Sequence, residues 1–136
     1  MSNVIVSIKP NFVELIRNGK KTHEFRKYVP NLGVTHLWIY ATMPVGKLQY
    51  LAIVDSITEY PNQIAEVGFG NDDFNAGLKK SKYAYHISHL FKLEKALTLE
   101  ELKANFGFTP PQSYLYLQSN VKLEGYLTKA TLQQIF

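Results

Sequence analysis

The sequence predicts an α+β protein, built as a small mixed β-barrel decorated by short helices. Segments of strand character are separated mostly by loops, and helical segments lie near the start and the end of the chain. A parallel sheet would instead require strands and helices that alternate regularly. With 136 residues, 46% of them hydrophobic, the chain is long enough for one core and too short for two. We therefore expect a single domain over residues 1–136.

The first forty residues predict a strand, a helix and two more strands. Residues 4–8 are apolar and β-branched, and Pro10 suits the first turn of a helix because proline has no amide proton to lose there. Asn18-Gly19 is typical of a left-handed helix end. Residues 22–27 and 36–42 alternate as strands do, so Thr22, Glu24 and Arg26 are expected on one face.

The middle of the chain predicts two strands around an irregular segment. Residues 50–59 and 83–93 have strand character. Between them, residues 61–82 are rich in Asn, Gly, Asp and Lys and read as a loop-rich excursion with one or two short helices. We expect this excursion to lie where it can act as a lid over a neighbouring cleft.

Two helices are predicted near the C-terminus. Thr98 and Glu101 form a capping box, and the helix that it opens should end before Gly107. Pro110-Pro111 then imposes an extended segment. Residues 128–136 are expected to form a short closing helix with its leucine, isoleucine and phenylalanine side chains inward.

The positive charge of the chain is concentrated at its start. The formal net charge is +4, and residues 1–30 hold six basic and two acidic side chains, whereas residues 31–136 hold nine of each sign. Four of the six cations lie between Lys20 and Lys27. This local basic patch indicates an anionic partner more strongly than the net charge does.

Three motifs occur in the order expected of one known family. They are SIKP at residues 7–10, GKKTHEFR at residues 19–26 and IYAT at residues 39–42. Gly19, Lys21, Glu24 and Arg26 match the form G-x-K-x-x-E-x-R, so the chain resembles the ASCH domain family. The resemblance extends over nearly the whole chain and implies a PUA-like barrel with an RNA-binding cleft beside the first helix, with a role in RNA metabolism or transcription regulation.

The chemistry of the matched residues agrees with an anion-binding cleft. Arginine can grip a phosphate or a base edge through two hydrogen bonds, and lysine acts as a mobile point charge. Tyr40 lies in the IYAT motif and offers a surface on which a base could stack. The predicted RNA- or nucleotide-binding residues are Lys9, Lys20, Lys21, Glu24, Arg26, Tyr40, Thr42, Gln112 and Ser113.

Two catalytic alternatives and one non-catalytic alternative stay open. Similar family members include small amidohydrolases that deacylate N4-acetylcytidine with a lysine, a threonine and a glutamate; Lys21 matches the lysine, but Glu24 stands where the threonine is expected. Ribonuclease activity is the second catalytic alternative, and a coactivator-type protein interaction is the non-catalytic one. Lys21 and Glu24 are the catalytic candidates, although the adjacent carboxylate favours a charged, anion-binding Lys21 over a catalytic one.

The remaining features predict no cofactor, no metal and no membrane. The chain contains no cysteine, and its start does not have the layout of a signal peptide, so we expect a cytoplasmic protein. His86 and His89 are three apart in a predicted strand and should face opposite sides, which is unsuitable for a chelating pair. No apolar run approaches the roughly 20 residues of a membrane-spanning helix.

Overall fold

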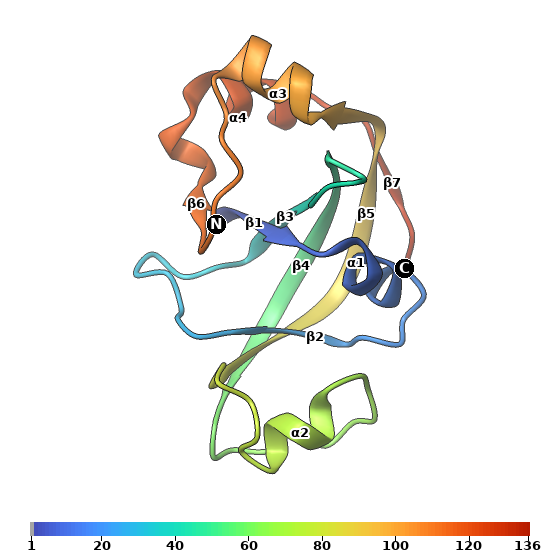
Figure 1. The fold of residues 1–136 in the computed structure, drawn as a ribbon, viewed down its shortest axis with the longest axis vertical. Coiled ribbons are helices and arrows are strands. Elements are labelled where there is room, and N and C mark those ends of the chain that lie inside the picture. Colours follow the sequence, from blue (N-terminus) through green and yellow to red (C-terminus); the bar gives the residue numbers. More distant parts are fainter. Residues whose placement is uncertain (1) are drawn as a thin grey trace.

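The computed structural model describes residues 2–136 (Figure 1). The strands are β1 (Asn3–Ile8), β2 (His23–Arg26), β3 (His36–Ala41), β4 (Lys47–Glu59), β5 (Tyr83–Thr98), β6 (Leu115–Tyr116) and β7 (Leu132–Gln134). The helices are α1 (Pro10–Arg17), α2 (Asn71–Asn75), α3 (Leu99–Phe106) and α4 (Val121–Thr128), with a 3-10 turn, η1, over Leu117–Ser119.

The strands form one mixed sheet that curls into a half-barrel. Its order is β2-β5-β4-β3-β1-β6, and β7 pairs with β5 beside this path. β1 runs parallel to β3, whereas the other pairs are antiparallel. Register shifts in the long β4–β5 pair mark bulges, which bend a sheet. The prediction of a mixed α+β barrel with short helices is confirmed.

The central strands are buried on both faces. On β1, Val4 and Val6 belong to a core cluster that includes residues of α1, whereas Ile5 belongs to a second cluster that includes residues of α3 and α4. On β3, Ile39 and Tyr40 divide between the clusters in the same way. A strand covered on both sides has no polar face, which explains why residues 4–8 are almost uniformly apolar.

Two helix starts follow the predicted local signals. Pro10 is the first residue of α1, where a missing amide proton costs nothing. The Thr98 side chain accepts from the Glu101 backbone N–H, and the Glu101 carboxylate accepts from the Thr98 backbone N–H, so the capping box is complete. α3 ends at Phe106, before Gly107 as predicted, and Gly107 caps it with a left-handed φ of 61°.

The excursion over residues 61–82 contains the short helix α2 and lies beside β2 (Figure 1). The centroid of its Phe69 ring also lies 5.7 Å from that of Phe12 in α1. The Phe69 backbone N–H donates to the Lys20 carbonyl at 2.8 Å, and the Asn71 side chain donates to Thr22 Oγ1 at 3.0 Å. Phe74 is buried in a small core cluster against which Phe25 of β2 packs. The excursion is therefore docked on β2, the strand that carries the matched motif.

The prediction of a closing helix over residues 128–136 is wrong. The helix α4 lies earlier, over Val121–Thr128, and the Asn120 side chain caps it by accepting from the Leu123 N–H. Leu132–Gln134 instead form the strand β7 against Leu93–Phe91 of β5. Pairing with a strand forty residues away outweighs the helix-like spacing of the apolar residues. Among the residues that the structure describes, no helix has the length and apolar character to cross a membrane.

Candidate functional site

Two neighbouring pockets lie along β2. We call the first the tyrosine pocket; its volume is about 360 Å³. It is lined by Val4, Val6, Phe25, Arg26, Lys27, Tyr28, Pro30, Ser81, Tyr85, Gln112, Ser113 and Tyr114. The second, the lysine pocket, has a volume of about 280 Å³ and is lined by Phe12, Lys21, Glu24, Phe25, Phe69, Lys79, Lys80 and Ser81. Phe25 and Ser81 belong to both, so the pockets adjoin.

One carboxylate links the two pockets. Glu24 Oε2 accepts from Arg26 Nε at 2.9 Å, and Glu24 Oε1 lies 3.4 Å from Lys21 Nζ. The alternation of β2 places Glu24 and Arg26 on the same face, as predicted. Two cations thus share one anion, and this cluster retains a net positive charge.

The Lys21 ammonium group is buried among aromatic rings. The residue is 5% exposed, and its Nζ lies 4.5 Å from the centroid of Phe25, 5.7 Å from that of Phe12 and 6.0 Å from that of Phe69. Burial lowers the pKa of Lys21 below its usual value, with Glu24 opposing that shift. The group is therefore a stronger acid than a surface lysine.

The Arg26 guanidinium joins β2 to two distant segments. Nη2 donates to the Ser7 carbonyl at 3.1 Å, and Nη1 donates to the Ser113 carbonyl at 3.2 Å. Ser7 Oγ in turn donates to the Pro111 carbonyl at 2.8 Å. These bonds fix the segment after the two prolines beside the motif, and they place Gln112 and Ser113 at the pocket.

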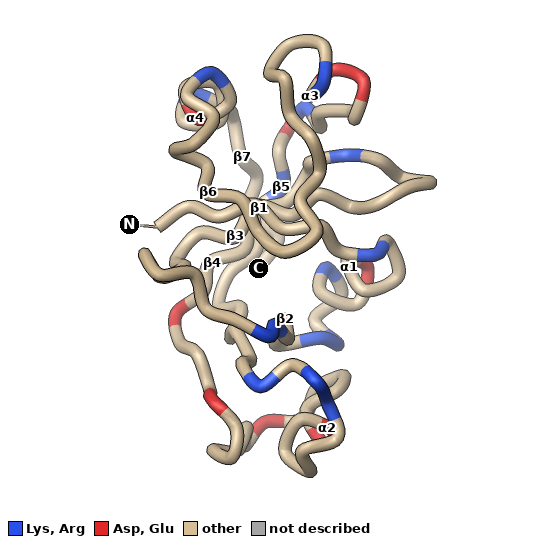
Figure 2. The backbone as a smooth tube through the Cα atoms, turned by 60° about the vertical axis from the view of Figure 1, so that its left-hand side comes forward, with Lys and Arg blue, Asp and Glu red and all other residues tan. Residues whose placement is uncertain are grey.

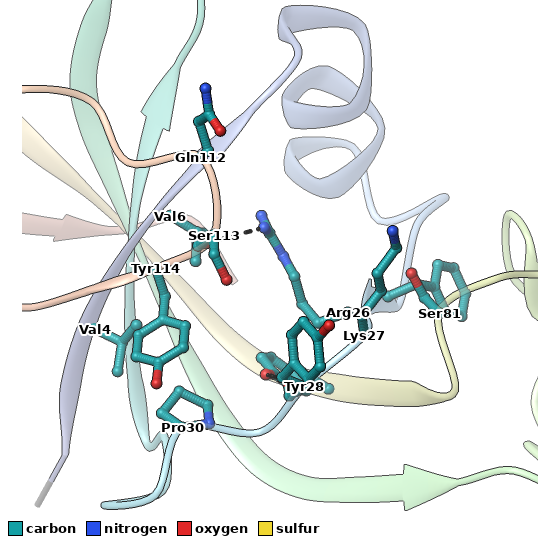
Figure 3. Close-up of a pocket in the computed structure, with 12 residues that line it drawn as sticks. Val4, Val6, Arg26, Lys27, Tyr28, Pro30, Ser81, Gln112, Ser113 and Tyr114 are labelled. Carbon is teal, nitrogen blue, oxygen red and sulfur yellow. Dashed lines mark hydrogen bonds between the residues drawn. The ribbon is translucent and has the colours of Figure 1, made fainter.

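The tyrosine pocket is bounded by aromatic side chains (Figure 3). Tyr28 and Tyr114 lie on its walls with Pro30, and the Arg26 side chain extends into the space between these residues and Ser113. Tyr85 is buried, which raises its pKa to about 12, and its hydroxyl donates to the Tyr28 carbonyl. The Tyr28 side chain itself is 65% exposed.

Five of the predicted site residues line these pockets, and four do not. Lys21, Glu24, Arg26, Gln112 and Ser113 come together as described. Lys9 and Lys20 are exposed, and neither lines either pocket. Lys9 follows β1, which pairs with β3 and β6, whereas the motif strand β2 pairs with β5.

Tyr40 and Thr42 lie away from the pockets. Tyr40 is 2% exposed in the second core cluster, where its ring centroid is 6.1 Å from that of Phe108. Thr42 is half-buried and accepts backbone N–H groups of Val45 and Gly46 in the turn after β3. Because both faces of β3 are covered, the structure gives Tyr40 no surface on which a base could stack.

Sequence reasoning expected the excursion beside a cleft but named none of its residues as site residues. Phe69, Lys79 and Lys80 complete the wall of the lysine pocket, and Lys79 Nζ lies 4.5 Å from the Phe25 centroid. The available signal was the basic run at residues 79–82, which holds three lysines. Figure 2 shows basic positions at the end of α1, along β2 and beside α2 gathered around this region. Across residues 2–136, no three or more His, Asp or Glu side chains are grouped to hold a metal ion.

The curled mixed sheet carries the matched motif at β2, with two adjoining pockets beside it. The family model described as ASCH domain matches residues 6–126, and the chain belongs to the ASCH domain family.

Relatives in the bacterium Zymomonas mobilis share this fold. A protein named ASCH domain-containing ribonuclease is 29% identical over 128 residues, which cover 84% of this chain and 83% of that protein. The crystal structure of ASCH from Zymomonas mobilis has a TM-score of 0.68 at 24% identity and covers 96% of each chain. A crystal structure of a tyrosine-to-phenylalanine variant has a TM-score of 0.72 at 23% identity, covering 96% of this chain and 100% of that one.

Proposed function

We propose that the protein binds RNA in the cleft formed by the tyrosine and lysine pockets. The observation that carries this proposal is the sharing of one carboxylate, Glu24, by the buried cation Lys21 and the half-buried cation Arg26. A net positive charge within a partly desolvated cleft attracts phosphate more strongly than the same charge in water. Lys79 and Lys80 extend that charge to the second pocket's wall. The name of the ribonuclease from Zymomonas mobilis supports RNA as the polyanion.

Binding should depend on salt through the lysines of the excursion. We expect Lys79→Ala combined with Lys80→Ala to weaken binding of a labelled single-stranded RNA and to make the slope of log affinity against log salt shallower by about 1.4, because each phosphate contact to a single strand contributes about 0.7. Titrations followed by fluorescence anisotropy at several salt concentrations measure this slope.

The matched control replaces two exposed lysines outside both pockets, Lys103 of α3 and Lys122 of α4, with alanine. An equal loss in the control pair would show that only diffuse charge matters and would remove the cleft from the proposal. Binding that ignores salt would favour a protein partner, and turnover of N4-acetylcytidine would favour an amidohydrolase.

Cleavage of the bound RNA is a second candidate, favoured by the environment of Lys21. In cleavage assisted by the ribose, the 2′-hydroxyl loses its proton to a base and its oxygen bonds to phosphorus. The P–O5′ bond breaks, and the departing oxygen takes up a proton, which leaves a 2′,3′-cyclic phosphate and a 5′-hydroxyl. Glu24 is suited to accept the first proton, and Lys21, whose pKa is lowered, is suited to supply the second.

A charge-conserving substitution separates this role from binding. Lys21→Arg keeps the positive charge but cannot readily give up a proton, so we expect RNA binding to persist while cleavage falls about 100-fold or more. Lys21→Ala should lose both. Electrophoresis of an end-labelled RNA measures cleavage, and an RNA with 2′-O-methyl groups throughout should stay intact. Cleavage at the original rate by Lys21→Arg would contradict the assignment.

A further inference from the structure

We propose that the tyrosine pocket receives one unpaired nucleobase of a single-stranded RNA, while an adjacent phosphate lies in the lysine pocket. This inference rests on the proposed RNA binding and adds the substrate class: single-stranded RNA whose inserted base carries a carbonyl oxygen. The arrangement of the two pockets about Phe25 and Ser81 is its starting point.

The two pockets differ in chemistry as the two parts of a nucleotide differ. The lysine pocket presents Lys21, Lys79 and Lys80 beside one carboxylate, Glu24, and its lysines suit a phosphate. The tyrosine pocket, at about 360 Å³, presents three tyrosines and two valines, with Arg26 and Lys27 as its charged side chains, and it falls within the usual size range of small-molecule sites, about 300–1,000 Å³. A base and its phosphate are held on opposite sides of one sugar, so adjoining pockets can take both.

The walls of the tyrosine pocket offer surfaces for stacking. Tyr28 lies on one side with most of its ring exposed, and Tyr114 lies on another beside Pro30 (Figure 3). Tyr114 packs edge-to-face against Tyr116, with the ring centroids 5.4 Å apart at 74°. A ring fixed in this manner loses little conformational freedom when a base stacks on it. Only an unpaired base can enter, because a duplex keeps its bases stacked inside.

The Arg26 guanidinium favours a base that carries a carbonyl acceptor. Its Nε donates to Glu24, Nη1 donates to Ser113 and Nη2 donates to Ser7, and Nη2 also lies 2.9 Å from Glu24 Oε2. Since Nη1 carries two N–H groups and uses one for Ser113, its second N–H remains for a ligand. This donor matches an exocyclic carbonyl of uracil, cytosine or guanine, whereas adenine has no carbonyl oxygen. We therefore expect a uridine octamer to bind more tightly than an adenosine octamer.

Substitution of the exposed tyrosine tests the stacking. Tyr28→Ala should weaken binding of a labelled uridine octamer about 5- to 150-fold, since stacking on one aromatic ring contributes about 1–3 kcal/mol per base. Tyr114→Leu should act in the same direction. The matched control is Tyr126→Leu on α4, a partly exposed tyrosine outside both pockets, which should leave the affinity unchanged. Circular dichroism confirms that each variant is folded.

The outcomes separate this inference from the proposed function. If Lys79→Ala with Lys80→Ala weakens RNA binding but Tyr28→Ala and Tyr114→Leu do not, the phosphate site is supported and the base pocket is contradicted. If none of these substitutions changes the affinity for RNA, both proposals are contradicted. Equal affinity for the uridine and adenosine octamers would overturn the base preference, and stronger binding of an RNA hairpin stem than of the single strand would overturn the choice of unpaired RNA.

Discussion

His23 is a buried histidine that folding keeps neutral. Its residue exposure is 3%, its Nδ1 lies 2.8 Å from Thr22 Oγ1, and its ring centroid is 5.0 Å from that of His86. Burial, followed by the positive charge of His86 and Lys21, lowers the pKa of His23 to about 4. Glu66 Oε1, 3.7 Å from His23 Nε2, is the facing carboxylate.

This histidine should make the protein less stable in mild acid. The unfolded chain, in which the pKa of His23 is about 6.5, takes up the proton before the folded protein does. The contribution of neutral His23 to the free energy of unfolding is therefore present above pH 6.5 and is lost as the pH falls toward 4. This contribution is about 3 kcal/mol, at about 1.4 kcal/mol per pKa unit. Urea unfolding between pH 7 and pH 4.5 should therefore show a flatter pH dependence for His23→Gln. His89→Gln, at an exposed position, is the control; a curve for His23→Gln that stays parallel to the original would contradict this account.

A glycine, Gly70, allows the excursion over residues 61–82 to approach β2 closely. Gly70 precedes α2 with φ of 80°, and a Cβ atom there would lie 2.8 Å from Cε2 of Phe25. Gly70→Ala should lower the free energy of unfolding by about 1–3 kcal/mol, because it combines an unfavourable φ with a clash. Gly125→Ala within α4, where a Cβ meets nothing within 4 Å, should instead raise it by up to about 1 kcal/mol. Equal effects in urea unfolding would show that the approach of Gly70 to Phe25 is not tight.

The elements that the sequence predicts correctly are those with strong local signals. Pro10 at the start of α1 and the Thr98–Glu101 capping box act within one turn of helix, so they can be recognised without knowing the fold. The exchange of a predicted closing helix for α4 and β7 has a non-local cause. Leu132–Gln134 are extended because β5 offers an edge for pairing, and a pattern in the sequence does not contain that edge.

At the scale of the whole molecule, the charged half of the site was more predictable than its aromatic half. Glu24 and Arg26 share a face of β2 through strand alternation, and Lys21 lies only three residues before Glu24, so their proximity is largely local. Whether a tyrosine faces the core or the cleft depends instead on which elements cover each face of the sheet. Tyr40 lies under α3 and α4, whereas Tyr114 reaches the cleft through the bonds that Arg26 makes to the segment after Pro111.

The position of β1 in the sheet also has a consequence for synthesis on the ribosome. β1 precedes the other strands of the sheet in the sequence, yet its two neighbours are β3 and β6, and β6 is formed by residues 115 and 116. One edge of β1 therefore stays unpaired until residues 115 and 116 have been translated. The cleft is completed at the same moment, because Gln112, Ser113 and Tyr114 arrive with β6. A nascent chain that is still short of this segment cannot yet hold a ligand between β2 and its C-terminal wall.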